Sequence, residues 1–158
     1  MPQTHVATAL HEEHLATLRL IARLEDFLGR PAPTAPDASV AALLRDIRHA
    51  VAREIGPHFR FEEEYLFPRL ADAGATELVA LLTEEHAQIL PLAESLADLA
   101  ARGPAPDRWR TFATTGAALA TALAAHVEKE EAGMLPALDE LLDAEADATR
   151  SLVHAELS

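Results

Sequence analysis

The sequence predicts an all-α protein, folded as an up-down-up-down antiparallel four-helix bundle. Apolar residues make up 49% of the chain but aromatic residues only 4%, so leucine and alanine dominate and favour helix. Apolar residues recur three to five positions apart in four long segments, which is the spacing of one helix face. Loops of roughly six to eight residues, rich in proline and glycine, separate the segments and favour antiparallel neighbours.

The first two segments have clear boundaries. The first is expected from about Thr4 to Leu28, before a loop, RPAPTAPD, that no helix can cross. The second is expected to begin at a cap on Asp37 or Ser39 and to continue towards Leu70. The apolar stripe of the first segment consists of Val6, Leu10, Leu15, Leu18, Ile21, Leu24 and Leu28.

The third and fourth segments are bounded by the same signals. The third is expected after Gly74, with Thr76 as its cap, and it ends at Gly103. The fourth is expected to begin at a cap on Asp107, and a short additional helix is expected from about 144 to 157. Four prolines inside helical patterns are each predicted to kink or end their helix, with Gly56-Pro57 the strongest candidate: Pro57, Pro68, Pro91 and Pro136.

The charge balance and composition exclude several classes of partner and site. With 13 basic and 26 acidic residues, the formal net charge of −13 repels nucleic acid and anionic lipid, so neither is expected as a partner. No stretch approaches the roughly 20 apolar residues of a membrane span, no signal peptide is visible, and a cytoplasmic location is expected. The length suits one domain, 1–158, with a core from about 4 to 142. Because cysteine is absent, any metal must be held by nitrogen and oxygen.

One motif occurs twice in the chain. Positions 58–70 are HFRFEEEYLFPRL and positions 126–138 are HVEKEEAGMLPAL, so a histidine, two glutamates and a proline recur at an offset of 68. Glu-Glu-His stands upstream of each copy, ending at His14 and at His86, an offset of 72. The chain is therefore interpreted as two helix pairs, with Glu-Glu-His on the first helix of each pair and the longer motif on the second.

The repeated histidines fall on the apolar stripes, so they are expected to be buried and to need partners. In each longer motif a glutamate follows the histidine by four positions and lies on the same helix face. Imidazoles and carboxylates without thiolates suit iron, and also manganese or zinc, and two glutamates could bridge a pair of ions. The alternative is a set of core histidines with ordinary partners in a metal-free structural bundle. The candidate metal ligands are His14, His58, Glu62, His86, His126 and Glu130.

From about His14 to Leu138, these motifs resemble the hemerythrin-like family of HHE cation-binding domains. The resemblance is carried by the repeated histidine and HxxxE pattern, followed by LFP in one copy and MLP in the other. It implies that the six candidates hold a non-haem di-iron centre, bridged by Glu62, Glu130 and an oxo or hydroxo group. It also implies the same bundle fold and a small diatomic ligand or peroxide as the partner. The protein is expected to be a monomer or a homodimer.

The sequence departs from the oxygen-carrying hemerythrins, which have HxxxH on the third helix. Here Leu82 and Leu90 stand four positions from His86, and the last pair is His126 with Glu130 instead of HxxxxD. The version with four histidines and two glutamates resembles members tied to iron sensing, to nitric oxide or peroxide chemistry and to iron–sulfur repair. We therefore expect a protein that binds or reacts with O2, NO or peroxide, with turnover left open. An iron- or oxygen-sensing or iron-handling module without turnover is the alternative.

Other residues beside the motif are candidates for supporting roles. Tyr65 stands three positions after Glu62, so it is a candidate hydrogen-bond donor to the bridging carboxylate or to bound ligand, and its counterpart Gly133 would leave room for a small molecule. The alternative is a core tyrosine opposite a glycine that relieves a kink.

His11, three positions before His14, is considered as a further ligand, but its counterpart Thr83 favours a partly exposed neighbour of the site. Glu63 and Glu131 are interpreted as solvated residues or partners of ligands, and Glu131 is the substitute if Glu130 is not a ligand. Three histidines are expected at the surface or terminus: His5, His49 and His154.

Overall fold

The computed structural model describes residues 2–33, 37–103 and 105–157, so loop positions 34–36 and 104 lie outside the described residues. Every regular element in these ranges is helical, which confirms the predicted all-helical class. None of the described helices is both long and apolar enough to cross a membrane. The elements, with η for a turn of π-helix, are α1 (His5–Leu28), α2 (Ala38–Ala50), η1 (Val51–Ile55), α3 (Gly56–Phe61), η2 (Glu62–Leu66), α4 (Phe67–Asp72), α5 (Thr76–Arg102), α6 (Pro106–Lys129), η3 (Glu130–Met134), α7 (Leu135–Leu141) and α8 (Ala144–Leu157).

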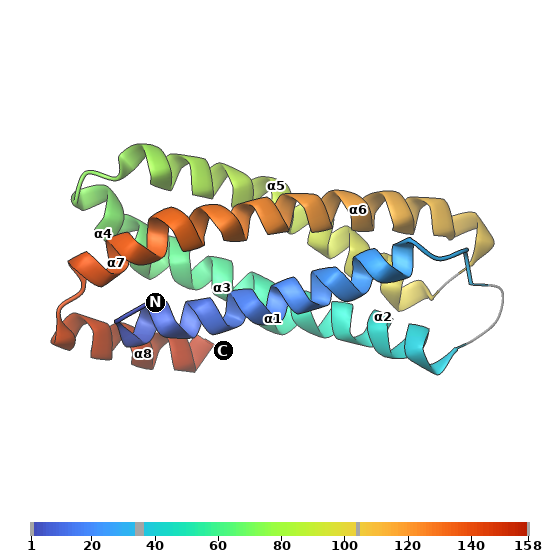
Figure 1. Cartoon of the computed structure of the whole chain (residues 1–158), viewed down its shortest axis with the longest axis horizontal. Coiled ribbons are helices and arrows are strands. Elements are labelled where there is room, and N and C mark those ends of the chain that lie inside the picture. Colours follow the sequence, from blue (N-terminus) through green and yellow to red (C-terminus); the bar gives the residue numbers. More distant parts are fainter. Residues whose placement is uncertain (1, 34–36, 104, 158) are drawn as a thin grey trace.

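The long segments lie lengthwise in a helical bundle and alternate in direction along the chain (Figure 1). α1 leads away from the N-terminus, the stretch from α2 to α4 returns, α5 leads out again, and α6 with α7 returns. The two copies of the repeated motif lie on the two returning stretches, where α4 contacts α7. The additional helix predicted at the end of the sequence is α8, which contacts α1 and α3.

Three turns of π-helix, η1, η2 and η3, widen the returning stretches. After each turn a backbone N–H donates to the carbonyl five residues earlier: Phe67 donates to Glu62 after η2, and Leu135 donates to Glu130 after η3. A proline lacks an N–H, and in an α-helix its ring would clash with the carbonyl four residues earlier. The wide turn makes room for the proline that follows it. These prolines therefore do not end their helices, and exposed Pro91 does not end α5 either. The prolines directly after the wide turns are Pro57, Pro68 and Pro136.

Two of the predicted helix caps are corrected. Thr76 is the first residue of α5 and not its cap, and the residue before it makes no side-chain hydrogen bond to the helix. Asp107 lies in the first turn of α6 because Pro106 takes the first helical position, for which its fixed φ is suited. Asp37 caps α2 as predicted, accepting the backbone N–H of Ser39 at 2.7 Å. The helix starts therefore shift by one or two residues without changing the predicted segments.

The apolar core has two parts, with the predicted ligand histidines between them. On α5, Leu82 belongs to one part and Ile89 to the other, and His86 stands between them. Each fully buried leucine or isoleucine contributes about 1.5–3 kcal/mol relative to an exposed one, so the histidines are held between two stabilising clusters. Leu15, predicted on the buried stripe of α1, is 41% exposed because it follows buried His14 by one position and points to another side.

Carboxylates from the C-terminal part of the chain cap the start of α1. Asp147 of α8 is buried and accepts the backbone N–H groups of His5 and Val6, each at 2.9 Å. Asp139 of α7 caps the two N–H groups before them. Caps of this kind stabilise a helix by about 0.5–2 kcal/mol each, so these bonds hold α8 and α7 against α1.

Candidate metal centre

Four helices bring the four repeated histidines together inside the bundle. His14 lies on α1, His58 on α3, His86 on α5 and His126 on α6. His14, His86 and His126 are buried, and the side chain of His58 is 10% exposed. The Nε2 atoms of all four rings lie close to carboxylate oxygens in the same interior region.

Two glutamates without exposed surface stand in this interior region. Glu62 and Glu130 each follow a histidine by four positions, and each is the first residue of a π-helical turn. The backbone carbonyl of each glutamate accepts the five-residue hydrogen bond of its turn. A proline therefore stands six residues after each glutamate because it follows the wide turn that the glutamate begins.

The donor atoms of the six candidates form two groups that share both carboxylates. Within each group, one donor atom from every residue lies within 4.8 Å of the others. The His14 group comprises His14, His58, Glu62 and Glu130, and the His86 group comprises Glu62, His86, His126 and Glu130.

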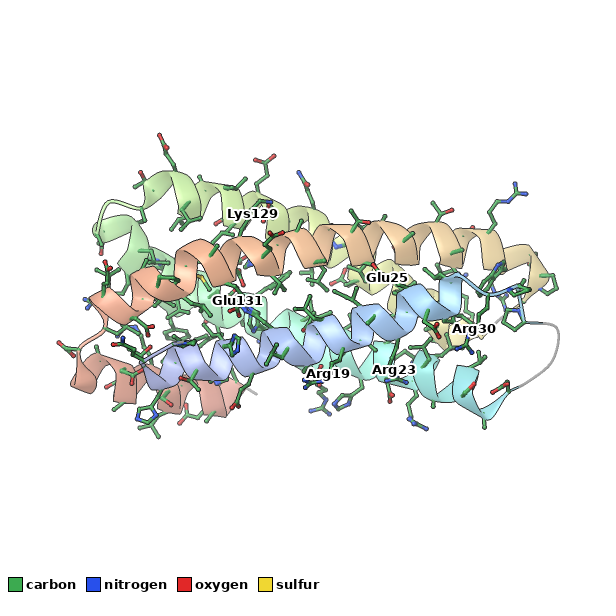
Figure 2. The ribbon with its side chains drawn as sticks, viewed as in Figure 1. Arg19, Arg23, Glu25, Arg30, Lys129 and Glu131 are labelled. Carbon is green, nitrogen blue, oxygen red and sulfur yellow. The ribbon has the colours of Figure 1, made fainter. Side chains whose placement is uncertain are left out.

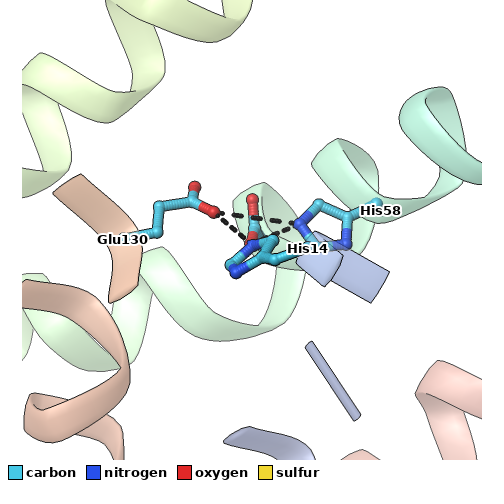
Figure 3. Close-up of side chains that lie close together, drawn as sticks. His14, His58 and Glu130 are labelled. Atoms are coloured by element: carbon cyan, nitrogen blue, oxygen red, sulfur yellow. Dashed lines mark ion pairs between the residues drawn. The ribbon is translucent and has the colours of Figure 1, made fainter. Parts of the chain in front are cut away.

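Glu130 directs one oxygen to each group. Its Oε2 lies 2.8 Å from His14 Nε2 and 3.9 Å from His58 Nε2, and Figure 3 shows these two contacts from the side of α1 and α3. Its Oε1 lies 2.7 Å from His126 Nε2. One carboxylate thus lies between histidines of both groups.

Glu62 divides its two oxygens in the same way. Its Oε1 lies 2.9 Å from His58 Nε2, and its Oε2 lies 3.3 Å from His86 Nε2. A carboxylate with one oxygen in each of two donor groups has the arrangement of a bridge between two cations. Both glutamates therefore place one oxygen against histidines of each group.

The donor atoms fit a metal cation. His14 Nε2 and both oxygens of Glu62 and Glu130 are buried, and although they lie against one another at ion-pair distances, none makes a well-aligned hydrogen bond in the described part of the chain. Burying carboxylates without compensation costs several kcal/mol, which a coordinated cation offsets. Imidazole nitrogens and carboxylate oxygens without thiolate are donors for iron, manganese or zinc.

In the absence of metal, the buried carboxylates favour the protonated forms of His58 and His86. Burial alone would lower the pKa of His86, but its contacts with Glu130 and Glu62 outweigh burial and raise that pKa to about 9. The pKa of His58 is raised well above its ordinary value against the effect of burial, chiefly by the charge of Glu62. Burial would raise the pKa of Glu130, but the surrounding imidazoles hold it well below its ordinary value. A bound cation would displace the protons that the histidines carry.

A second set of carboxylates contacts Nδ1, the outer ring nitrogen, of each of the four histidines in the donor groups. A ring whose Nδ1–H donates to a carboxylate keeps a fixed orientation and leaves Nε2 free for a metal. These carboxylates belong to the second glutamate of each Glu-Glu pair in the repeat. The Nδ1 contacts, at 2.6 to 2.8 Å, join His14 to Glu131, His58 to Glu13, His86 to Glu63 and His126 to Glu85.

Glu131 and His11 lie outside both donor groups. Glu131 projects towards α1, as Figure 2 shows, and its Oε2 lies 2.8 Å from His11 Nδ1 while its Oε1 contacts His14. Glu131 thus contacts the outer nitrogen of His14, whereas Glu130 belongs to both donor groups. Our sequence reasoning assigned no role to Glu13 and Glu85, although the doubled glutamate before each histidine was a usable signal.

Comparison with models of protein families matches residues 5–138 to the hemerythrin HHE cation-binding domain. The chain belongs to the hemerythrin HHE cation-binding domain family. The match covers both copies of the repeated motif and confirms the resemblance seen in the sequence. Comparison with curated proteins gave no match. The chain is thus an all-helical hemerythrin HHE domain with histidine and glutamate groups placed for metal binding, and α8 lies beyond the matched residues.

Tyr65 lies away from the donor groups of this hemerythrin HHE domain. Its side chain is 36% exposed, its ring centroid lies 5.7 Å from that of Phe61, and its hydroxyl makes no hydrogen bond to the described residues. The wide turn η2 changes the helical phase, so that Leu66 takes the buried position that an α-helical period assigns to Tyr65. The expected hydrogen bond from Tyr65 to the site is therefore absent from this structure.

Gly133 borders α5 and not the space between the donor groups. A Cβ atom at this position would lie 3.7 and 3.8 Å from the side chain of Leu78, which is ordinary van der Waals contact. We expect Gly133→Ala to stabilise the protein by up to about 1 kcal/mol, because alanine loses less backbone entropy in a helix. Thermal unfolding should show a rise of about 2–4 °C. Gly74→Ala is the control: with φ at 99°, it should lower the unfolding temperature, and a fall for Gly133→Ala as well would contradict the expectation.

His154 lies near the end of the sequence, one of the two places expected for it, but it is largely shielded from solvent, whereas His5 and His49 are exposed. Its side chain is only 14% exposed, and its Nε2 lies 2.7 Å from Glu13 Oε1. The ring lies edge-on to Phe61, with centroids 4.9 Å apart. The contact with Glu13 was not expected from the sequence, because the place of α8 against α1 and α3 depends on contacts between distant parts of the chain.

A cavity of about 710 Å³ reaches one side of the donor groups in this hemerythrin HHE domain. Its lining includes His14, His58, His126 and Glu130, together with His154 of α8. His86 is not part of the lining, and its ring is covered by aromatic neighbours. A molecule that enters the cavity therefore reaches three of the four histidines of the donor groups, and His86 alone lies behind them.

Proposed function

We propose that this protein is a non-haem di-iron protein that binds or reacts with O2, NO or peroxide. The observation that carries the proposal is the pair of four-donor groups sharing Glu62 and Glu130, with buried oxygens that make no well-aligned hydrogen bond to the described residues. Each group would hold one iron ion with its two histidines and one oxygen of each glutamate. Manganese or zinc suits the same donors, so the metal must be identified by experiment.

The side chains would position the metals and shield them from water. Glu62 and Glu130 would hold two ions together, and the outer carboxylates would keep the imidazoles in orientation. Bound iron would supply the electron transfer to a small molecule that these side chains cannot perform. Phe59 stacks on His86 with centroids 3.8 Å apart, and Phe67 lies 5.3 Å from the same ring, so the His86 group is protected on that side.

The cavity would admit the small ligand to the His14 group. His58 is the most exposed of the four histidines, and it lines the cavity with His14. O2, NO and hydrogen peroxide are all far smaller than the cavity volume of about 710 Å³. The geometry thus supports access from one side, with His86 behind the three donor-group histidines that line the cavity.

We further propose that residues 1–158 form a single domain with a core from about 4 to 142, arranged as an up-down-up-down four-helix bundle. Support comes from the packing of Val153 and Leu157 of α8 against the same apolar cluster as α1 and α7. The protein would act as a monomer or a homodimer.

Stopped-flow optical spectra of the reduced, iron-loaded protein with O2, NO and hydrogen peroxide test the proposed reactivity. A stable O2 adduct would show carrier-like binding, and rapid loss of peroxide would show turnover. A spectral response without turnover would favour a sensing or iron-handling role. Iron-loaded protein that responds to none of the three would contradict the proposal.

A further inference from the structure

The outer carboxylate of the second half of the chain is held by a lysine. Glu85 places Oε2 2.7 Å from His126 Nδ1, and its other oxygen, Oε1, pairs with Lys129 Nζ. Figure 2 shows Lys129 on the same segment as Glu131, but on the side away from α1. A cation thus holds the far oxygen of the carboxylate that orients His126.

The first half has the same carboxylate but lacks the lysine. Glu13, 72 residues before Glu85, places its Oε2 2.6 Å from His58 Nδ1. The offset of 68 that relates the two longer motifs puts Phe61 at the position equivalent to Lys129. Phe61 is 1% exposed and carries no charge, so it cannot pair with Glu13.

His154 of α8 stands where the first half lacks the lysine. Its Nε2 lies 2.7 Å from Glu13 Oε1, the oxygen equivalent to the one that Lys129 contacts on Glu85. Its ring rests edge-on against Phe61, the residue that occupies the lysine position. Phe61 therefore replaces the lysine of the second half, and His154 packs against Phe61 and makes the contact to Glu13 that Phe61 cannot make.

Several contacts fix α8 so that His154 can reach Glu13. Asp147 caps the start of α1, and Arg150 donates from Nε to the backbone carbonyl of Tyr65 at 3.2 Å. Val153 packs against the apolar cluster under α8. The side chain of His154 is therefore presented by a helix that is anchored on both sides of it.

We propose that His154 is a positioning residue for His58, acting through Glu13, and that it takes the part that Lys129 plays for His126. The inference rests on the proposed metal centre, because it assigns His58 to the His14 group of ligands. This role of His154 makes the two donor groups unequal. The His86 group depends on Lys129 of its own repeat, whereas the His14 group depends on α8, which lies outside the family match.

Stepwise affinity for Zn²⁺, measured by competition with a chelator, tests the proposal in the full chain. We expect His154→Ala to weaken one of the two binding steps on the order of tenfold and to leave the other step unchanged, since outer partners of metal ligands carry effects of this size. His154→Lys should restore most of the lost affinity, because the lysine ammonium can donate to the same oxygen of Glu13, as Lys129 does to Glu85. Leu152→Ala, on the exposed side of α8, should change neither step.

Histidine side-chain NMR of the metal-free protein provides a second readout. His154→Ala should alter the ring-nitrogen signals of His58 and leave those of His126 unchanged, whereas Lys129→Ala should do the reverse. Unchanged signals of His58 together with unchanged Zn²⁺ affinities in His154→Ala would overturn the proposal. Equal losses in His154→Ala and His154→Lys, with equal falls in unfolding temperature, would show a purely structural role and would also overturn it.

The two arms separate this proposal from the proposed function. Wild-type protein that binds no metal would contradict the di-iron centre, and the NMR comparison would still decide whether His154 orients His58. Wild-type protein that binds two ions, with His154→Ala indistinguishable from it in both arms, would contradict the role of His154 alone.

Discussion

Glu130→Gln is expected to abolish tight binding at both metal positions. Glu130 contributes one oxygen to each donor group, and glutamine keeps its size while removing the negative charge and one of the two acceptor oxygens. The affinity should fall by more than about a hundredfold at each position, beyond the range of effects of outer partners. Metal content after dialysis and competition with a chelator measure the loss.

Two glutamates near Glu130 on the same stretch of helix provide control variants for this prediction. Glu131→Gln should lower the affinity by only about 10- to 100-fold, because Glu131 contacts the outer nitrogen of His14. Glu128→Gln, at an exposed position, should have no effect. If Glu131→Gln removed the metal and Glu130→Gln kept it, Glu131 would be the ligand and the assignment of the donor groups would be wrong.

Removal of metal is expected to lower the unfolding temperature strongly. Protons on the histidines are then all that offsets the two buried carboxylates, and the folded state loses the free energy of metal binding. At a free metal concentration about a thousand times the dissociation constant, this loss is about 4 kcal/mol for each bound ion, or about 8–16 °C per ion for a chain of this size. Calorimetry of metal-loaded and metal-free protein measures the difference.

Glu130→Gln also serves as the control for metal removal. Its unfolding temperature should be the same with and without metal, because neither group can then bind a cation tightly. Equal unfolding temperatures for the loaded and metal-free wild type, at saturating metal, would argue against a cation bound by the folded site.

The segments of the fold could be predicted because their apolar stripes keep the helical period over several turns. Prediction from the α-helical period failed where the backbone forms a π-helical turn instead. It assigned Tyr65 to the ligand face, but η2 begins at Glu62 and widens the helix by one residue, so Leu66 is buried instead. The proline that follows η2 marks this turn in the sequence, yet a proline alone does not distinguish a wide turn from a helix end.

The convergence of the six candidate residues could be predicted from the repeat, because identical spacing on paired helices brings the same faces together. The outer carboxylates were harder to assign, since Glu13 and Glu85 are partly exposed and surface glutamates are common. His154 could not be placed, because its contact with Glu13 joins positions at opposite ends of the chain. That contact depends on the packing of α8, which no local pattern specifies.

The number of metal ions per chain tests the central claim most directly. Protein purified from iron-replete cells without chelators should contain two iron ions per chain, one for each donor group that shares Glu62 and Glu130. Elemental analysis against a protein concentration from amino-acid analysis gives this ratio. Less than one iron ion per chain, with no other metal in its place, would contradict the di-iron centre.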